Sequence, residues 1–300
     1  MIEIPSELKV AIVNRLVELR ANFDGTDAAY ARQYGISPSV YSTLKNAKKF
    51  DGLLKPVQWI NLSRDLDIAL NKPQWNMVRT EVFNIIEEEV LHCKAHSKSM
   101  IFVDACEIGK SFSLKYLART LKNTFYVDCS QAKTRLLFIR TLAKSIGLVD
   151  NDTVSNLKSQ IKQALRLLPN PVILLDEAGD LDYKAFLDIK ELWNSTEGIC
   201  GWYMSGADGL RAKIEVGMGY NKVGYEEIFS RFGRRYSQVV PREKNERQAF
   251  YKKLITDVLS ANMKDRSQLP AIVQRCLVND NRGRVGGLRR AEDLLILNEA

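Results

Sequence analysis

The spacing of apolar residues divides the chain of 300 residues into three parts. Residues 1–70 show the spacing of short helices, and residues 76–95 show that of one long helix. Residues 100–240 alternate short apolar runs with helical segments, and the segments after Pro241 are all helical. We therefore expect three domains, at residues 1–72, 73–240 and 241–300.

The middle part predicts a parallel sheet. Its strand-length apolar runs lie at Ile101–Val103, Thr124–Asp128, Val172–Leu175, Gly201–Ser205 and Tyr236–Val240. Helical segments lie between them, at residues 111–121, 133–146, 153–167 and 182–195, and the last part predicts helices near residues 242–261, 268–278 and 286–298. The run Val172–Leu175 is apolar at every position, as in a central strand that is covered on both faces. This alternation predicts an α/β fold with helices on both faces of the sheet.

A candidate phosphate-binding loop follows the first strand. Residues 104–111 read Asp-Ala-Cys-Glu-Ile-Gly-Lys-Ser, and their second half matches the pattern GxxxxGK[ST]. Gly109 lets the backbone bend around a phosphate, Lys110 would reach the β- and γ-phosphates of ATP, and Ser111 would bind Mg²⁺. The residues expected to contact the nucleotide here are Cys106, Glu107, Ile108, Gly109, Lys110, Ser111 and Phe112. For the tripeptide alone, the alternative is an ordinary turn from strand to helix.

Two acidic residues depart from the usual loop. Asp104 stands where the pattern has its first glycine, and Glu107 lies within the loop. Negative charge beside a triphosphate weakens binding unless the carboxylates turn away or meet a cation. The pair therefore makes nucleotide binding a safer expectation than efficient hydrolysis.

Two carboxylates follow the most apolar strand. Asp176 and Glu177 would emerge at its carboxyl end, where open α/β sheets bind their ligands. Asp176 would hold Mg²⁺ through water, and Glu177 would orient the attacking water as a general base. Solvated acids at the end of a strand are the alternative. The presence of both motifs in one α/β unit favours an ATP site.

Composition narrows the class of partner. The formal net charge of +8 favours polyanions, and a hydrophobic content of 45% suits a globular protein. Five scattered cysteines without a CxxC pair indicate the reduced thiols of a cytoplasmic protein. His92, Cys93 and His96 lack the further ligand that zinc needs. No apolar run reaches the length of a membrane span and no signal peptide is visible, so no membrane partner is expected.

These motifs together resemble the AAA+ ATPases. The Asp-Glu pair, with Ile228-Phe-Ser-Arg-Phe before the last strand, is similar in spacing to the transposition target-selection ATPases of the Mu B, IstB and TnsC types, over about residues 20 to 298. The resemblance implies an AAA+ P-loop parallel sheet with a helical lid and an N-terminal all-α helix-turn-helix domain. It also implies ATP and Mg²⁺ as cofactors, and duplex DNA and a DDE-type transposase as partners. Self-assembly into a ring or helical filament and a bacterial or phage origin follow from the same resemblance.

An arginine finger is implied before the last strand. Arg231 matches the residue that reaches the γ-phosphate held by the neighbouring subunit, which makes it a catalytic residue with Glu177 and Lys110. Arg234 and Arg235 are rival candidates for the same role.

Two sensor residues are implied as well. Arg289, in Gly286-Gly-Leu-Arg-Arg, matches the sensor-2 arginine of the lid, and Arg290 takes its place if the register shifts. Ser205 is the candidate for sensor 1 on the strand that ends Tyr-Met-Ser-Gly-Ala, with Ala207 as the other position.

Residues 27–46 match a helix-turn-helix. A small residue stands at the helix crossing, a glycine stands in the turn, and apolar anchors follow, at Ala31, Gly35, Ile36, Tyr41 and Leu44. Ser37 would cap the second helix, with Pro38 at its first position. Residues of types that suit DNA contacts are Ser39, Ser42, Thr43, Lys45, Asn46, Lys48, Lys49 and Lys55. A helical module that binds another protein is the alternative.

The resemblance implies a second DNA surface after the second strand. Lys133, Thr134 and Arg135 hold the positions that line the inside of the filament in the family. A solvated helix start is the alternative.

The sequence thus predicts an ATP-dependent DNA-binding protein that oligomerises on duplex DNA and delivers target DNA to a transposase. ATP hydrolysis is expected to be slow and stimulated by DNA or the transposase. The first alternative is an ATPase of the helicase-loader or initiator type, and the second is a DNA-binding regulator that binds nucleotide without hydrolysing it.

Overall fold

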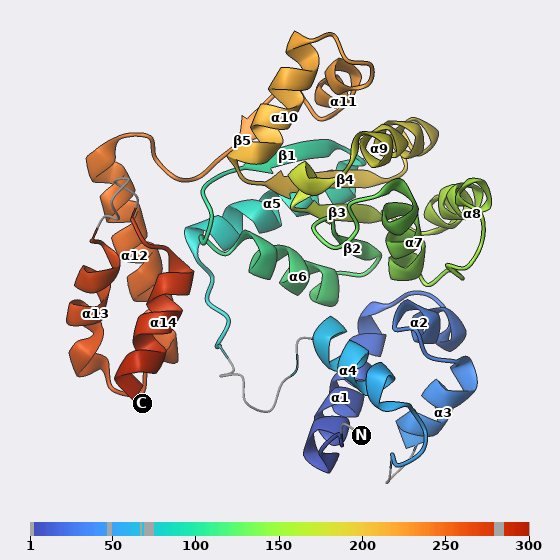
Figure 1. Cartoon of the computed structure of the whole chain (residues 1–300), viewed down its shortest axis with the longest axis horizontal. Coiled ribbons are helices and arrows are strands. Elements are labelled where there is room, and N and C mark those ends of the chain that lie inside the picture. The colour runs from blue at the N-terminus through green and yellow to red at the C-terminus, as the bar shows by residue number, and fades with distance from the viewer. Residues whose placement is uncertain (1–2, 47–49, 67, 69–74, 279–284, 300) are drawn as a thin grey trace.

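The structure is a computed structural model that describes residues 3–46, 50–66, 68, 75–278 and 285–299. Figure 1 shows a helical N-terminal domain, a central sheet domain, and a C-terminal helical domain beside the sheet. The elements of the N-terminal domain are α1 (Ser6–Leu19), η1 (Arg20–Asn22), α2 (Asp27–Gln33), α3 (Pro38–Asn46) and α4 (Pro56–Asp65). The domain boundary predicted at residue 72 lies outside the described residues.

The central domain is built on a parallel sheet of five strands in the order β2-β3-β4-β1-β5. Its strands are β1 (Ser99–Val103), β2 (Thr124–Asp128), β3 (Val172–Asp176), β4 (Gly201–Gly206) and β5 (Tyr236–Ser237). Its helices are α5 (Glu81–His96), α6 (Lys110–Thr120), α7 (Arg135–Ile146), α8 (Val154–Leu167), η2 (Ala178–Asp180), α9 (Tyr183–Ser195), α10 (Asp208–Gly219) and α11 (Tyr225–Arg231). The α/β fold class predicted from the alternation is confirmed.

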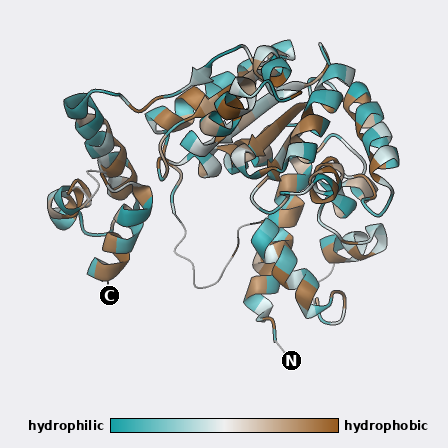
Figure 2. Cartoon of the chain, turned by 45° about the horizontal axis from the view of Figure 1, so that its top comes forward, coloured by the Kyte–Doolittle hydropathy of each residue, from teal (hydrophilic) through white to brown (hydrophobic). Residues whose placement is uncertain are grey.

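Helices cover both faces of the sheet. Ile173 and Leu175 of β3 pack in one core with α7, α8 and α9, and with α10 and α11. Val172 and Leu174 point to the opposite face and pack with α5, α6 and the C-terminal helices. Figure 2 shows apolar residues along the strands, between the surrounding helices. All five residues of β3 are buried, as its apolar run predicted.

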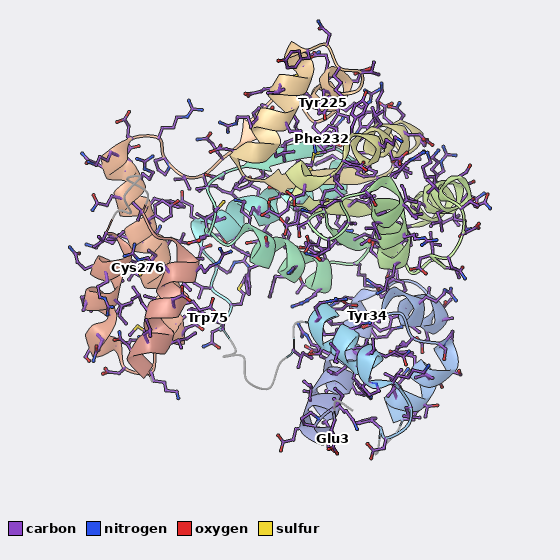
Figure 3. All side chains as sticks on the ribbon, viewed as in Figure 1. Glu3, Tyr34, Trp75, Tyr225, Phe232 and Cys276 are labelled. Carbon is purple, nitrogen blue, oxygen red and sulfur yellow. The ribbon has the colours of Figure 1, made fainter. Side chains whose placement is uncertain are left out.

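The C-terminal domain contains α12 (Lys244–Asn262), η3 (Arg266–Gln268), α13 (Leu269–Cys276) and α14 (Leu288–Glu299), and we call it the lid. Its apolar residues continue the core on the α5 and α6 face of the sheet. The segment before α5 also contacts the lid, because the indole nitrogen of Trp75 donates to Glu292 at 3.0 Å (Figure 3). None of the described helices is long and apolar enough to cross a membrane.

Several element boundaries differ from the prediction. The helix expected from residue 76 begins at Glu81, because the side chain of Thr80 caps it by accepting the N–H of Phe83 at 3.2 Å. The last strand ends at Ser237 and not at Val240, because the N–H groups of Val239 and Val240 are bonded to a side chain of the phosphate loop.

Two helices that the sequence did not predict, α10 and α11, lie between β4 and β5. Glycines interrupt the helical pattern there, and each has a packing reason. A Cβ at Gly217 would lie 2.4 Å from the ring of Tyr225, and one at Gly224 would lie 2.4 Å from a methyl group of Leu187. Gly217 therefore permits close packing within α10, whereas Gly224 lies in the turn before α11 with a φ of 96°.

The N-terminal domain contains the predicted helix-turn-helix. Gly35 has a φ of 67° in the turn between α2 and α3, a conformation that favours glycine. Ser37 caps α3 by accepting the N–H of Val40 at 3.3 Å, and Pro38 is its first residue. The predicted anchors Tyr41 and Leu44 are buried.

This domain is docked on the central domain at the edge where the strands begin. Asp24 lies 3.0 Å from Lys122 and accepts a hydrogen bond from Asn123, which precedes β2. Arg32 donates to the carbonyl of Gly147 at 3.0 Å, just after α7. Tyr34 lies on the side of the domain that faces the core (Figure 3). The docking contacts thus come from the segment before α2, from α2 itself and from Asp65 at the end of α4, which lies 3.6 Å from Lys144.

Replacement of Gly147 by alanine should loosen this docking. Gly147 has a φ of 87°, and a Cβ would lie 2.6 Å from the carbonyl oxygen of Ala29. We expect Gly147→Ala to destabilise the chain by about 1–3 kcal/mol and to make the N-terminal domain easier to remove by protease. Urea unfolding and limited proteolysis measure the two effects.

The matched control is Gly198→Ala. Gly198 has a φ of 72°, and a Cβ there would meet nothing within 4 Å. It carries the same backbone strain without the domain contact, so proteolysis of its N-terminal domain should not change. Equal sensitivity of the two variants would contradict the docking assigned to Gly147.

Candidate nucleotide-binding site

The candidate site lies where the strands end. Side chains alternate along a strand, and Phe102, Leu174 and Tyr203 share the face that carries α6. Two positions further on, Asp104, Asp176 and Ser205 therefore point to that same face. Polar groups from three neighbouring strands thus meet beside the N-terminus of α6.

The phosphate loop takes the conformation that its glycine permits. Gly109 has a φ of 98° and directly precedes α6, whose first N–H groups point to the site. Lys110 is buried, and its ammonium group donates to the carbonyls of Asp104 at 2.8 Å and Ala105 at 2.5 Å. Burial lowers the pKa of Lys110, and nearby acidic groups oppose that shift.

The remaining loop residues have different surroundings. Ile108 is buried, Cys106 is an exposed free cysteine, and Phe112 stacks on Tyr116 with ring centroids 6.5 Å apart. The predicted set is therefore brought together by one loop, with Ile108 as its core anchor.

Both unusual acids of the loop are engaged. One carboxylate oxygen of Asp104 accepts the N–H groups of Val239 and Val240 at 2.5 and 2.9 Å, and the other accepts the N–H of Ala105. Glu107 faces the lid, with an oxygen 3.4 Å from Arg289. Asp104 thus accepts hydrogen bonds from backbone N–H groups, and Glu107 lies beside a cation. These partners offset the repulsion between the two carboxylates and a triphosphate.

Asp176 is a buried carboxylate, with a relative exposure of 2%. Burial raises its pKa, and hydrogen bonds from the hydroxyl groups of Ser111 and Tyr126 oppose the shift. The Tyr126 hydroxyl donates to Asp176 at 2.8 Å. A serine hydroxyl and a carboxylate at the end of a buried strand are the donor types that Mg²⁺ takes in phosphate sites, so these residues fit the ion.

Tyr126 is a residue of the site that was not predicted from the sequence. It lies on β2 in register with Leu174 of β3, so the alternation of side chains places it on the face of Asp176. The alternation of side chains along β2 could have indicated which face Tyr126 lies on. Only the order of the strands shows that this face is beside Asp176.

Glu177 lies just beyond Asp176 in a left-handed conformation, with a φ of 49°. Its side chain is partly buried. Burial raises its pKa, the charge of Asp176 raises it further, and Lys110 opposes the shift. A carboxylate with a raised pKa accepts a proton more readily than an ordinary glutamate, which suits a general base.

Ser205 is fully buried on β4, and its hydroxyl oxygen has no hydrogen-bond partner in the described part of the chain. A buried polar group without a partner is costly, and such groups persist where a ligand or water satisfies them. The orphaned hydroxyl, on the face of Asp176, is consistent with the predicted sensor role. Ala207 offers no polar side chain.

Arg231 lies at the opposite edge of the sheet. Its guanidinium donates to Asn194 at 2.7 Å and stacks over Trp193 at 5.2 Å. It lines a pocket with Ser99, the first residue of β1, whereas Asp104 follows the last residue of that strand. The length of β1 separates the two edges by about 16 Å. Arg231 is therefore remote from the phosphate loop of its own chain.

The rival arginines differ in their contacts. Arg234 pairs with Glu226 at 2.7 Å, and Arg235 is exposed. In the lid, Arg289 lies beside the loop, whereas Arg290 donates to the carbonyl of Val278 at 2.9 Å. Arg289, and not Arg290, therefore lies beside the phosphate loop in the structure.

The predicted DNA-contacting residues fall into two groups. In α3, Ser39, Ser42, Thr43, Lys45 and Asn46 are exposed. Lys45 lies 3.6 Å from Asp27. Lys48 and Lys49 lie outside the described residues. The exposed face of α3 thus has the predicted composition.

The second group is engaged within the chain. Lys133 pairs with Asp180 at 2.9 Å, and Arg135 pairs with the buried Asp188 at 2.8 Å. Thr134 precedes the first residue of α7. A DNA contact by Lys133 or Arg135 would therefore compete with an existing ion pair.

The histidine–cysteine segment forms no metal site in the structure. The rings of His92 and His96 lie 4.9 Å apart on α5, while Cys93 is buried. Over the described ranges, no group of three His, Cys, Asp or Glu residues could hold a metal ion.

Comparison with known proteins bears on the central domain. Residues 81–214 match the family model of the AAA domain. No curated protein matches the chain. One similar solved structure is the RuvB Holliday junction branch migration motor of Thermotoga maritima, at 14% sequence identity and a TM-score of 0.39. The similarity covers 73% of this chain and 63% of that chain.

The family match and the site geometry agree on the central domain. The matched segment begins with α5 and continues into α10, so it includes the phosphate loop, Asp176, Glu177 and Ser205. Residues 81–214 are therefore similar to the AAA domain, and the chain has the AAA+ P-loop fold.

Proposed function

We propose that this protein is an ATPase that assembles on duplex DNA and delivers target DNA to a DDE-type transposase. ATP would lie between subunits, and hydrolysis would release them. The observation that carries the proposal is the position of Arg231 at the edge of the sheet opposite the phosphate loop. A site that needs this arginine can be completed only by a second copy of the chain.

Each group at the phosphate loop has a role that its surroundings support. The first N–H groups of α6 and the ammonium of Lys110 would bind the β- and γ-phosphates of ATP. Ser111 and Asp176 would hold Mg²⁺, and Tyr126 would keep the carboxylate of Asp176 oriented. A bound Mg²⁺ neutralises phosphate charge that develops during transfer. The orphaned hydroxyl of Ser205 would donate its hydrogen bond to the site.

Glu177 would be the general base. Its raised pKa increases its affinity for the proton of the attacking water, and the charge of Lys110 opposes that rise. Because Asp104 is bonded to backbone N–H groups and Glu107 to the lid, neither acid argues for a protein that only binds nucleotide.

The helix-turn-helix supports the DNA partner. Its first helix packs on α7, while α3 presents hydroxyl, amide and lysine side chains to solvent. These are the groups that contact phosphates and base edges. The domain is fixed to the core, so DNA on α3 would have a defined orientation relative to the sheet. The transposase itself is proposed from the resemblance in sequence spacing alone.

Substitution of Glu177 tests the chemistry. Glu177→Gln should retain ATP binding and lower the rate of phosphate release by at least about 100-fold, because the water loses its base. In the wild type, turnover should fall as pH drops through the raised pKa of Glu177, since protonation removes the base. Lys110→Ala should lose ATP binding itself. Equal, background-level turnover of the wild type and Glu177→Gln would favour the non-hydrolysing regulator.

Mixing two inactive variants tests the shared site. Arg231→Ala retains Glu177, and Glu177→Gln retains Arg231, so a mixed assembly contains complete sites. In an equal mixture with random head-to-tail pairing, half of the sites contain Glu177 and half of those face a neighbour with Arg231. About a quarter of the sites should therefore be complete, and the mixture should regain turnover. A mixture as inactive as its components would show that Arg231 is not supplied by a neighbour. If Arg235→Ala loses turnover and Arg231→Ala keeps it, Arg235 is the arginine finger.

Electron microscopy with duplex DNA tests assembly. Rings or filaments on DNA should form with ATP and not with ADP, and DNA affinity should fall steeply with salt. Lys45→Ala should reduce the slope of the salt dependence by about one, whereas Lys252→Ala, which removes the same charge from the lid, should leave it unchanged. Absence of DNA-bound oligomers with ATP would contradict the proposal. Binding to a replicative helicase and not to a transposase would favour the loader alternative.

A further inference from the structure

The phosphate loop and the lid are bonded through one residue, Glu107. Its carbonyl oxygen accepts the N–H of Leu288 at 2.8 Å, and its side chain accepts the N–H of Gly287 at 3.3 Å. The other carboxylate oxygen lies 3.4 Å from the guanidinium of Arg289. Three consecutive residues at the start of α14 thus contact a single residue of the loop.

The packing at this contact is close. A Cβ at Gly287 would lie 2.5 Å from the Cβ of Glu107 and 2.6 Å from its carbonyl oxygen, so only glycine fits. Leu288 approaches Gly109 as well, since a Cβ there would lie 3.5 Å from a methyl group of Leu288. The start of α14 therefore rests directly on the loop.

Glu107 is held in an unfavourable backbone conformation. Its φ is 62°, in the left-handed region that costs energy for a residue with a side chain. Such a conformation persists when surrounding contacts stabilise it. Here the bonds to Gly287 and Leu288 supply those contacts, so the conformation of the loop and the position of the lid depend on each other.

The second acid of the loop is bonded at the base of the lid. Asp104 accepts the N–H groups of Val239 and Val240, which lead from β5 toward α12. The loop therefore contacts the lid at two places, at the chain entry through Asp104 and at the start of α14 through Glu107.

The carboxylate of Glu107 resembles a phosphate in what it offers an arginine. Both are anions with oxygens that accept hydrogen bonds from a guanidinium. The Arg289 side chain is 75% exposed, so its pair with Glu107 is readily exchanged for another anion.

We propose that Glu107 is a positioning residue that competes with the γ-phosphate of a nucleoside triphosphate for Arg289. This inference rests on the proposed nucleotide site. When the loop holds a diphosphate, Arg289 stays with Glu107 and the lid keeps the position seen here. A triphosphate takes Arg289 from Glu107, and the lid follows the arginine. The preference for ATP over ADP is therefore weakened by Glu107.

Nucleotide affinities of the full chain test the competition. In Glu107→Gln the amide keeps an oxygen for the N–H of Gly287 but loses the charge that holds Arg289. The dissociation constant for ADP divided by that for ATP should rise about two- to fivefold, which corresponds to the stabilisation from one exposed ion pair. In the Arg289→Ala background the same substitution should change the ratio less, because only general repulsion by Glu107 remains. Equal changes in the two backgrounds would overturn the proposal.

Amide hydrogen exchange without nucleotide tests the contact itself. Glu107→Ala should speed exchange in residues 285–290 about two- to tenfold, the size of one net hydrogen bond, and Glu107→Gln should restore protection. Glu197→Ala, which removes an exposed carboxylate far from the lid, is the control and should leave these residues unchanged.

The two tests separate the two proposals. If residues 285–290 exchange alike in the wild type and Glu107→Ala, Glu107 does not hold the lid and this inference fails, whatever the nucleotide affinities are. If the exchange result is as expected but neither ATP nor ADP binds, the proposed nucleotide site fails, and the competition for Arg289 fails with it.

Discussion

A parallel sheet has two unlike edges, and most of this protein's chemistry depends on that constraint. Every strand ends at one edge, where Asp104, Asp176 and Ser205 meet the loop before α6. Every strand begins at the other edge, where Arg231 lies beside the start of β1 and the N-terminal domain docks near Asn123. Arg231 is thereby kept apart from Asp176 and Glu177 within one chain. A second copy, placed edge to edge, can bring them together.

The carboxyl edge is arranged for a ligand at some cost to stability. Asp176 is a buried carboxylate whose pKa is raised, Lys110 is a buried ammonium that is bonded to loop carbonyls, and Ser205 is a buried hydroxyl without a partner over the described residues. Burial of such groups is unfavourable unless they are paired. The surrounding apolar core, with β3 buried at every position, offsets that cost. Sites of this type are stabilised by what they bind.

The partners of Asp104 and Glu107 change how these two acids of the phosphate loop are interpreted. As sequence, Asp104 and Glu107 are negative charges beside a triphosphate. In the structure, Asp104 is bonded to the backbone that leads into the lid, and Glu107 is bonded to the start of α14. The departure from the usual loop pattern therefore coincides with the contact between loop and lid. An ordinary glycine at position 104 has no side chain that could make such a bond.

The sequence by itself determined the local features of this protein. Apolar spacing predicted the five strands, most clearly β3, since a strand buried on both faces must be apolar throughout. The pattern around Gly109 predicted the loop, because few residues permit its conformation. Only the tertiary structure decided what depends on strand order and on residues distant in the chain. Tyr126 reaches Asp176 because β2 lies beside β3, and Glu107 meets Arg289 across 182 positions. Gly217 lies within α10 and packs against Tyr225, although the local pattern alone indicates a loop there. Spacing along the chain records which way a side chain points, but the partner it meets is set by how the elements pack.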